Sequence, residues 1–234
     1  MRIVEYAKEE ELGVEAASLF MEELHKHPDL LLCAATGSSP IPLYNQLAKI
    51  AIRNNSLFHD LRLIPLDEWI GLPDHEGSCD EYLRQYLLEP LKIDKERYLN
   101  FNPAGIDLNQ ECLRIHQLLK EQGPIDLCIL GMGKNGHLGF NEPADELQSH
   151  CHIASLSTGS QQHGMIKKTI QKPTRGLTLG MQDILSSRRI ILLISGDGKE
   201  EAKHQFFSRT ISSKCPASML WQHNNVDCLI LVNH

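Results

Sequence analysis

The residues most suited to chemistry lie between Leu130 and Pro143, in the segment LGMGKNGHLGFNEP. A continuous apolar run, Asp126–Leu130, precedes them and is typical of a strand buried on both faces of a parallel sheet. The segment therefore emerges at the carboxyl end of a strand, the edge where open α/β sheets bind their ligands. Its glycines allow sharp turns and a close approach of the backbone to a ligand.

Two ionisable groups in this segment could move protons. His137 carries an imidazole whose ordinary pKa is about 6.5, and Glu142 follows five residues later, where its carboxylate could orient the imidazole. The alternative is a glycine-rich turn with a surface histidine and a solvated glutamate. The combination of strand end, glycines, histidine and carboxylate favours a site.

Three further loops follow apolar runs and could reach the same edge. Thr36–Pro40 reads TGSSP and opens a helix, so its amides and hydroxyls could bind an anion; the alternative is a simple helix cap. Asp67, Glu68 and Trp69 follow the run Leu61–Leu66, and a carboxylate half-buried beside Trp69 would have a raised pKa suited to a general base. A solvated turn or a cap is the alternative there.

The last of these loops is Ser195–Lys199, with the sequence SGDGK. Lys199 stands at the start of a predicted helix, where its ammonium group could bind a phosphate as a point charge. The alternative is a solvated surface lysine.

The elements that position these loops alternate along the chain. Short apolar runs predict strands and amphipathic segments predict helices, which indicates an α/β fold with a Rossmann-like, mostly parallel sheet flanked by helices. No linker or repeat divides residues 1–234, so a single domain is expected. The predicted strands are Ile3–Tyr6, Leu30–Ala35, Leu61–Leu66, Asp126–Leu130, Ile190–Ser195 and Cys228–Val232; the predicted helices are Glu9–His25, Ile41–Asn54, Asp80–Leu88, Gln110–Gln122 and Lys199–Phe207.

Composition excludes several classes of protein. A net charge of −7 disfavours nucleic acid and acidic membrane surfaces as partners. The sequence has neither a signal peptide pattern nor an apolar run long enough to span a bilayer, so a cytoplasmic protein is expected. Seven cysteines without CxxC spacing favour reduced thiols, and Cys33, Cys128 and Cys228 fall inside predicted buried strands.

Two other kinds of site are rejected on their spacing. His150, Cys151, His152 and His163 offer metal-ligating atoms without a recurrent ligand spacing, so no metal site is expected. A serine hydrolase is disfavoured because the chain lacks a Gly-x-Ser-x-Gly elbow.

Taken together, the motifs resemble the amino-sugar-phosphate isomerase/deaminase family, typified by glucosamine-6-phosphate deaminase. The resemblance runs through TGSSP, LDEWIGLP, GMGKNGHLGFNEP, TLGMQDIL and SGDGK in this order, over nearly the whole chain. The combination of LDEW, GKNGHLG, NEP, RGLTLG and PASMLW is closer to the galactosamine-6-phosphate branch. The fold expected from the resemblance is that of glucosamine-6-phosphate deaminase.

The resemblance also implies roles for individual residues. Asp67 is the base that moves a proton between C2 and C1 of the sugar, His137 assists ring opening, and Glu142 positions His137. Gly37, Ser38, Ser39 and Lys199 bind the substrate phosphate. Such an aldose-to-ketose shift with loss of ammonia needs staged proton transfers and no metal or organic cofactor.

Three departures from the family pattern stand out. Asn135 replaces an aspartate two positions before the histidine, so it cannot exchange a proton but can hydrogen-bond through both ends of its amide. In place of a phosphate-binding arginine, the segment 159–168 offers only Lys167 and Lys168, which are not assigned to the site. The extension of longer family members after the last strand is missing, so their allosteric control is not expected.

The sequence therefore predicts an enzyme that converts galactosamine 6-phosphate to tagatose 6-phosphate and ammonia. Asn135 is the residue through which we expect a preference for the C4 epimer. The alternatives are glucosamine-6-phosphate deaminase, a 6-phosphogluconolactonase and a sugar-phosphate-binding protein without catalysis. The lactonase loop resembles GPDGHTASLFP, so LGFNEP argues against it. A homo-oligomer is compatible with a domain of this kind, and the sequence leaves the oligomeric state open.

Overall fold

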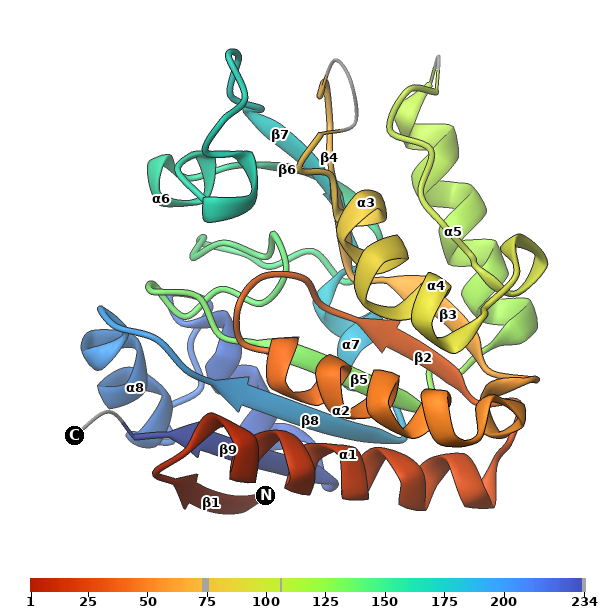
Figure 1. Cartoon of the computed structure of the whole chain (residues 1–234). Helices are drawn as coiled ribbons and strands as arrows, with labels where there is room; N and C mark the ends of the chain where they lie inside the picture. The colour runs from red at the N-terminus through yellow and green to blue at the C-terminus, as the bar shows by residue number, and fades with distance from the viewer. Residues whose placement is uncertain (73–75, 106, 233–234) are drawn as a thin grey trace.

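A computed structural model describes residues 1–72, 76–105 and 107–232 of the chain. Pro73, the last residue of the LDEWIGLP motif, lies outside the described residues. Within them the chain forms two sheets, a larger parallel one and a smaller antiparallel one above its edge (Figure 1). No helix in the described part of the chain is both long and apolar enough to cross a membrane.

The larger sheet has six strands in the order β1-β9-β8-β5-β2-β3, all parallel. Every strand predicted from the apolar runs is present, which confirms the mostly parallel α/β fold. The strands of this sheet are β1 (Arg2–Tyr6), β2 (Leu31–Ala34), β3 (Arg62–Pro65), β5 (Leu127–Gly131), β8 (Arg189–Ile194) and β9 (Val226–Leu231).

Helices cover both faces of this sheet, as its doubly apolar strands require. One core contains Leu32 and Ala34 of β2 with Phe20 and Leu47 from helices α1 and α2. The neighbouring strand residues point to the other core, where helices α5, α7 and α8 pack. The α-helices are α1 (Glu9–Lys26), α2 (Ile41–Arg53), α3 (Cys79–Leu83), α4 (Glu89–Leu91), α5 (Leu108–Gln122), α6 (Thr158–Gln161), α7 (Met181–Leu185) and α8 (Glu200–Phe207).

The predicted helix Asp80–Leu88 begins one residue earlier and changes its geometry partway. Ser78 caps it, since its hydroxyl accepts the Glu81 N–H at 2.9 Å. After Leu83 the chain continues as a π-helical turn, Arg84–Leu88. Short 3₁₀ segments occupy Asn55–Phe58, Lys95–Arg97, Gly164–Ile166 and Pro216–Gln222.

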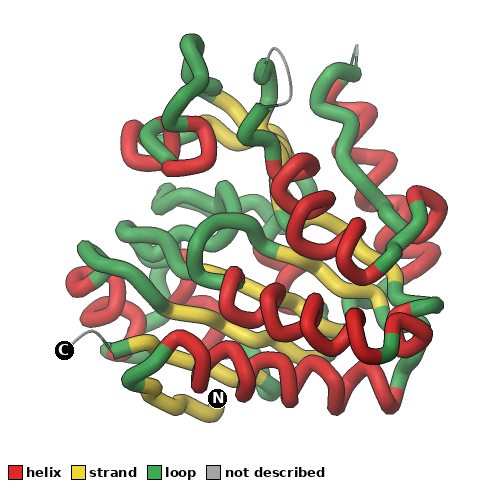
Figure 2. The backbone as a smooth tube through the Cα atoms, viewed as in Figure 1, coloured by secondary structure: helices red, strands yellow, loops and turns green. Residues whose placement is uncertain are grey.

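The smaller sheet was not predicted. Its strands are β4 (Asp67–Trp69), β6 (His152–Ser155) and β7 (Arg175–Thr178), in the order β4-β7-β6 and antiparallel. Asp67 therefore opens a strand of a second sheet, only one residue, Leu66, after β3 ends. Figure 2 shows loops gathered between the two sheets, at the carboxyl edge of the parallel strands.

Candidate active site

Loops that follow β2 and β8 meet at Ser39. The Ser195 hydroxyl donates to the Ser39 hydroxyl at 3.1 Å, and the Lys199 ammonium donates to the same oxygen at 3.4 Å. The two loops lie far apart in the sequence, because Ser195 and Lys199 follow Ser39 by 156 and 160 residues. Adjacent parallel strands end at the same edge, which is why β2, β5 and β8 bring their loops together.

Lys199 lies in an environment that favours an anionic partner. Burial, with the charges of Lys203 and Lys134, lowers the pKa of Lys199 to about 8. Lys134 comes close, since a Cβ built on Gly198 would lie 3.2 Å from the Lys134 Nζ. Lys199, Lys134, Ser39 and Ser195 thus form a positively charged group, called the recess below, whose charge a phosphate would neutralise.

Gly37 lies two residues before Ser39, in the same loop. Its φ of 93° lies in the left-handed region that glycine adopts without strain. Its carbonyl accepts the Tyr82 hydroxyl at 2.6 Å, and a Cβ at Gly37 would lie 3.4 Å from Nε2 of His163. Ser38 is exposed here and lines a pocket of about 450 Å³ together with His163.

Asp67 is buried at the start of β4, with 6% of its surface exposed. Burial raises the pKa of Asp67 to about 6, although a hydrogen bond from the Cys79 thiol at 3.5 Å and the charge of His137 act in the opposite direction. A carboxylate in this state is a base near neutral pH. The charge of His137 acts on Asp67, and the Cys79 sulfur lies 3.6 Å from Oγ1 of Thr36 in the TGSSP loop.

Glu68, the next residue, points away from Asp67 because side chains alternate along a strand. Its carboxylate accepts the backbone N–H groups of Trp69, Cys79 and Asp80 at 2.7, 3.0 and 2.7 Å. The last two belong to the first turn of α3. Burial raises the pKa of Glu68 to about 7 against these donors. Glu68 therefore anchors α3 to β4.

His137 and Glu142 form a compact network with Asn135. The Nδ1 atom of His137 lies 3.4 Å from Oε2 of Glu142, and the Asn135 amide donates to the same oxygen at 2.8 Å. The Asn135 oxygen accepts the His137 backbone N–H at 3.2 Å. Both ends of the amide are thus used inside the network, as the sequence allowed.

The other oxygen of Glu142 accepts hydrogen bonds from the hydroxyls of Ser157 and Ser160. Burial acts to raise the pKa of Glu142, but the hydrogen bonds and charge of His137, with Ser160 and Asn135, outweigh it and lower the pKa to about 2. Glu142 is therefore ionised at neutral pH. A fixed negative charge beside Nδ1 orients the imidazole.

The backbone at Gly133 makes room for the imidazole. A Cβ at this position would lie 2.1 Å from Nε2 of His137, so any side chain would displace the ring. The Gly133 N–H also donates to the His137 carbonyl at 3.0 Å. The glycine thus fixes the ring between the Gly133 backbone and Glu142.

The structure therefore groups the predicted residues in two neighbouring sets: Gly37, Ser38, Ser39 and Lys199 around the recess, and Asp67, His137, Glu142 and Asn135 beside it. Lys167 and Lys168, which the sequence did not assign, are exposed. Five further residues were not predicted from the sequence. They are Lys134, the second lysine of the recess; Ser157 and Ser160, which donate to Glu142; Cys79, which donates to Asp67; and His163, which lies beside Gly37. Of these five, Lys134 alone could have been predicted from the sequence, because it lies inside the glycine-rich segment.

Comparison with known proteins identifies the family. Residues 7–229 match the family described as glucosamine-6-phosphate isomerases/6-phosphogluconolactonase. The Escherichia coli K12 protein named "Putative deaminase AgaI" is 38% identical over 220 residues, which cover 94% of this chain and 87% of that protein. The glucosamine-6-phosphate deaminase of Bacillus pumilus is 36% identical over 98% of this chain and 97% of its own.

A solved structure of a monomeric glucosamine-6-phosphate deaminase superposes with a TM-score of 0.91 at 35% identity, covering 98% of this chain and 97% of that one. The match confirms the fold expected from the sequence motifs. A family model that matches almost the whole chain, together with relatives above 30% identity, places the chain among enzymes. The protein belongs to the glucosamine-6-phosphate isomerase/6-phosphogluconolactonase family.

Proposed function

We propose that the protein isomerises and deaminates an amino-sugar 6-phosphate, releasing a ketose 6-phosphate and ammonia. One observation carries this proposal: Asp67 is a buried carboxylate with a pKa raised to about 6, and the charge of His137 acts on it. The Cys79 thiol that donates to Asp67 lies 3.6 Å from Oγ1 of Thr36, in the loop that contains Ser38 and Ser39. The pairing of a base with a proton donor suits isomerisation, which needs both. Relatives named as deaminases support the same reaction class.

In the proposed reaction the recess binds the phosphate. Ser38, Ser39 and the backbone around Gly37 supply hydrogen-bond donors, and Lys199 supplies charge. Lys134 adds a second positive charge. Anchoring the phosphate holds the opposite end of the sugar toward Asp67 and His137, which lowers the entropic cost of reaching the reactive geometry.

His137 acts first, by donating a proton to the ring oxygen as the bond from C1 to that oxygen breaks. Ionised Glu142 orients the imidazole for this transfer, and Asn135 and the two serines keep the carboxylate in place. The ring opens to an aldehyde at C1 when the C1 hydroxyl loses its proton.

Asp67 then removes the proton from C2, and the electron pair forms a double bond between C1 and C2. The aldehyde oxygen takes back the proton that the C1 hydroxyl released on ring opening, which gives an enolamine. Return of the proton to C1 leaves an imine at C2. Water adds to this imine and the nitrogen leaves as ammonia, so one water is consumed and a ketone remains. The same carboxyl group thus serves as base and then as acid, as a pKa near 6 permits.

Galactosamine 6-phosphate is the substrate we propose within this class. Asn135 presents an amide where the gluco enzymes have an aspartate, and an amide both donates and accepts while a carboxylate only accepts. One N–H and one acceptor position of Asn135 remain for a hydroxyl of the sugar after the bonds to Glu142 and His137. We assign the preference for the C4 epimer to these groups.

Ammonia release from galactosamine 6-phosphate and glucosamine 6-phosphate, measured in parallel on the purified protein, tests the reaction and the epimer together. We expect release from both, with a higher kcat/KM for the galacto epimer. A preference for the gluco epimer would overturn the epimer assignment and keep the reaction. Release from neither would overturn the reaction, and hydrolysis of 6-phosphogluconolactone would then identify a lactonase.

Asn135→Asp tests the specificity residue directly. We expect the ratio of kcat/KM for the galacto and gluco epimers to fall roughly tenfold, about 1.4 kcal/mol of differential binding in the transition state. Asn135→Ser is the matched control, since it shortens the side chain without adding a charge 2.8 Å from Glu142. An unchanged ratio in Asn135→Asp contradicts the assignment.

A further inference from the structure

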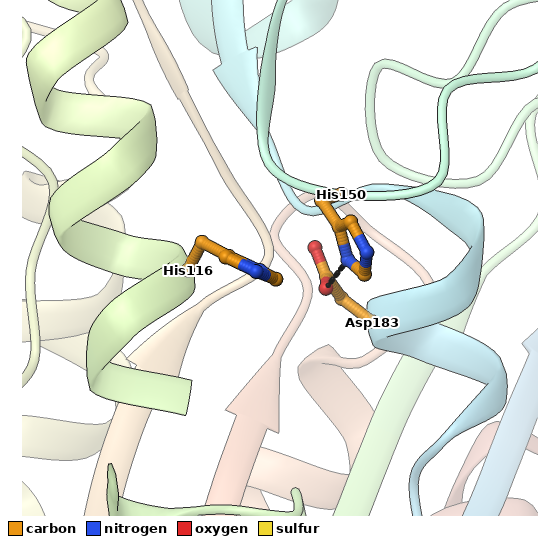
Figure 3. A group of neighbouring side chains, drawn as sticks. All are labelled: His116, His150 and Asp183. Carbon is orange, nitrogen blue, oxygen red and sulfur yellow. Dashed lines mark hydrogen bonds and ion pairs between the residues drawn. The ribbon is translucent and has the colours of Figure 1, made fainter. Parts of the chain in front are cut away.

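A second group of ionisable side chains lies on the face of the parallel sheet covered by α5 and α7. His116 projects from α5, His150 from the segment before β6, and Asp183 from α7 (Figure 3). One nitrogen or oxygen atom of each lies within 4.8 Å of those of the other two. The two imidazole rings lie with their centroids 4.2 Å apart, tilted by 49°.

Asp183 is held in a fixed orientation within this group. Its Oδ2 atom accepts the Gly180 backbone N–H at 3.0 Å, and its Oδ1 atom faces Nδ1 of His150 at 2.8 Å. The Asp183 side chain is 5% exposed, while that of His150 is 49% exposed. The carboxylate is therefore buried and oriented by the backbone, and solvent reaches the group from the side of His150.

This pair differs from the one at His137. Glu142 accepts hydrogen bonds from an amide and two serines besides His137, so its oxygens are fully used. Capping of α7 uses Oδ2 of Asp183, and Oδ1 faces Nδ1 of His150. Two imidazoles and a carboxylate oxygen held by a backbone N–H form a common ligand set for zinc and related ions.

We propose that His116, His150 and Asp183 bind a divalent transition-metal ion, with Zn²⁺ as the ion that fits best. Zinc takes imidazole nitrogen and carboxylate oxygen at about 2.0 to 2.2 Å in four-coordinate geometry, so its ligand atoms lie about 3.3 Å from one another. Solvent fills the fourth position on the exposed side. If Nδ1 is the ligand atom of His150, its hydrogen moves to Nε2, so the metal replaces the hydrogen bond to Asp183.

The bound ion would connect three segments that are far apart in the sequence. It would join α5 to α7 and to the segment that enters β6. We expect it to stabilise the folded chain, because an ion that binds only the folded state shifts unfolding by mass action. The site takes no part in the proposed sugar chemistry, so it stands or falls independently of the proposed function.

Two thiols lie next to this group and could attract the same metals. Cys112 precedes His116 by one helical turn, Cys151 follows His150 directly, and each thiol shifts the pKa of the other. The group of His116, His150 and Asp183 contains no sulfur. A test must therefore distinguish nitrogen and oxygen ligation from thiolate ligation.

The test is a titration of ZnCl₂ into the full chain after dialysis against EDTA, read by calorimetry and by competition with a coloured chelator. We expect one ion per chain with a Kd on the order of micromolar or tighter, and at least tenfold weaker binding by His116→Asn and Asp183→Asn. His204→Asn is the matched control, an exposed histidine on α8 outside the group. Its affinity should equal that of the unaltered chain.

Further measurements keep the test decisive. The double variant Cys112→Ser with Cys151→Ser should bind zinc like the unaltered chain, and Co²⁺ should show ligand-field bands without thiolate charge-transfer absorption. Circular dichroism checks that each variant folds, and zinc should raise the melting temperature of His204→Asn but not of His116→Asn. Absence of zinc binding, or binding that follows the thiols and survives His116→Asn, overturns the proposal.

Discussion

The two faces of β4 carry adjacent carboxylates that are both buried and both have raised pKa values, yet they do different things. Glu68 accepts three backbone N–H groups and fastens the first turn of α3. Asp67 has one weak thiol donor and the charge of His137 nearby. A buried carboxylate whose hydrogen bonds are satisfied by backbone is structural, whereas one left largely unsatisfied is available for reaction.

The contrast shows why a raised pKa alone does not identify a base. Burial is the largest cause of the shift at both residues, and the pKa is about 7 at Glu68 and about 6 at Asp67. The partners of each carboxylate decide its role. Replacing each carboxylate by the corresponding amide, in Asp67→Asn and Glu68→Gln, tests this difference between the two residues.

The largest effect is expected from Asp67→Asn. An amide cannot accept the C2 proton, so kcat/KM for amino-sugar 6-phosphate should fall by about 10² to 10⁴. The melting temperature should not fall, because the change removes a buried, poorly satisfied carboxylate. Ammonia release and thermal unfolding measure both quantities, and turnover close to that of the unaltered chain would remove Asp67 as the base.

Glu68→Gln should give the opposite pattern. The amide nitrogen must face at least one of the three backbone N–H groups, so we expect the free energy of unfolding to fall by about 1 to 3 kcal/mol. Turnover of the folded protein should stay within a few-fold. Chemical denaturation and steady-state kinetics check the two parts, and a rate loss as large as that of Asp67→Asn would end the distinction between the two faces.

The pH dependence of kcat/KM tests the ionisation states that we assign to Asp67 and Lys199. Asp67 must be ionised to accept a proton, so the rate should fall as the pH drops through about 6. Lys199 must be protonated to bind the phosphate, so the rate should also fall as the pH rises through about 8. In Lys199→Arg the alkaline limb should disappear because arginine stays charged, while the acid limb should remain.

The smallest effect is expected from Cys79→Ala. Its thiol lowers the pKa of Asp67 through a hydrogen bond, so its removal should move the acid limb of kcat/KM upward by less than about one pH unit. Cys79→Ser keeps a donor and is the control that should leave the limb in place. A limb that does not move in Cys79→Ala would show that the thiol has no influence on the base.

Much of the fold could be predicted from local patterns. The runs that became β2, β5 and β8 are buried on both faces, so they are continuous in sequence and easy to find. The smaller sheet escaped because its strands, DEW, HIAS and RGLT, mix polar with apolar residues and form no continuous apolar run. Their pairing is long-range, and no periodicity develops over so few residues.

The site residues likewise differ in whether the sequence alone could identify them. Asp67, His137 and Lys199 follow apolar strands, and a strand end is visible in sequence. His163 and Ser160 belong to a polar segment whose contact with Gly37 and Glu142 depends on the tertiary fold. His150 was considered only with Cys151, His152 and His163, whereas its partner Asp183 lies 33 residues away.

The separation of the two sheets has one more consequence. In the proposed reaction the loops of the parallel sheet hold the phosphate, while the base stands on the smaller sheet, joined to β3 through Leu66 alone. A sugar phosphate must reach from the phosphate-binding loops to Asp67. The distance between them therefore restricts the number of carbons between the phosphate and the reacting centre. Selection by chain length then follows from the architecture, before any hydroxyl is recognised.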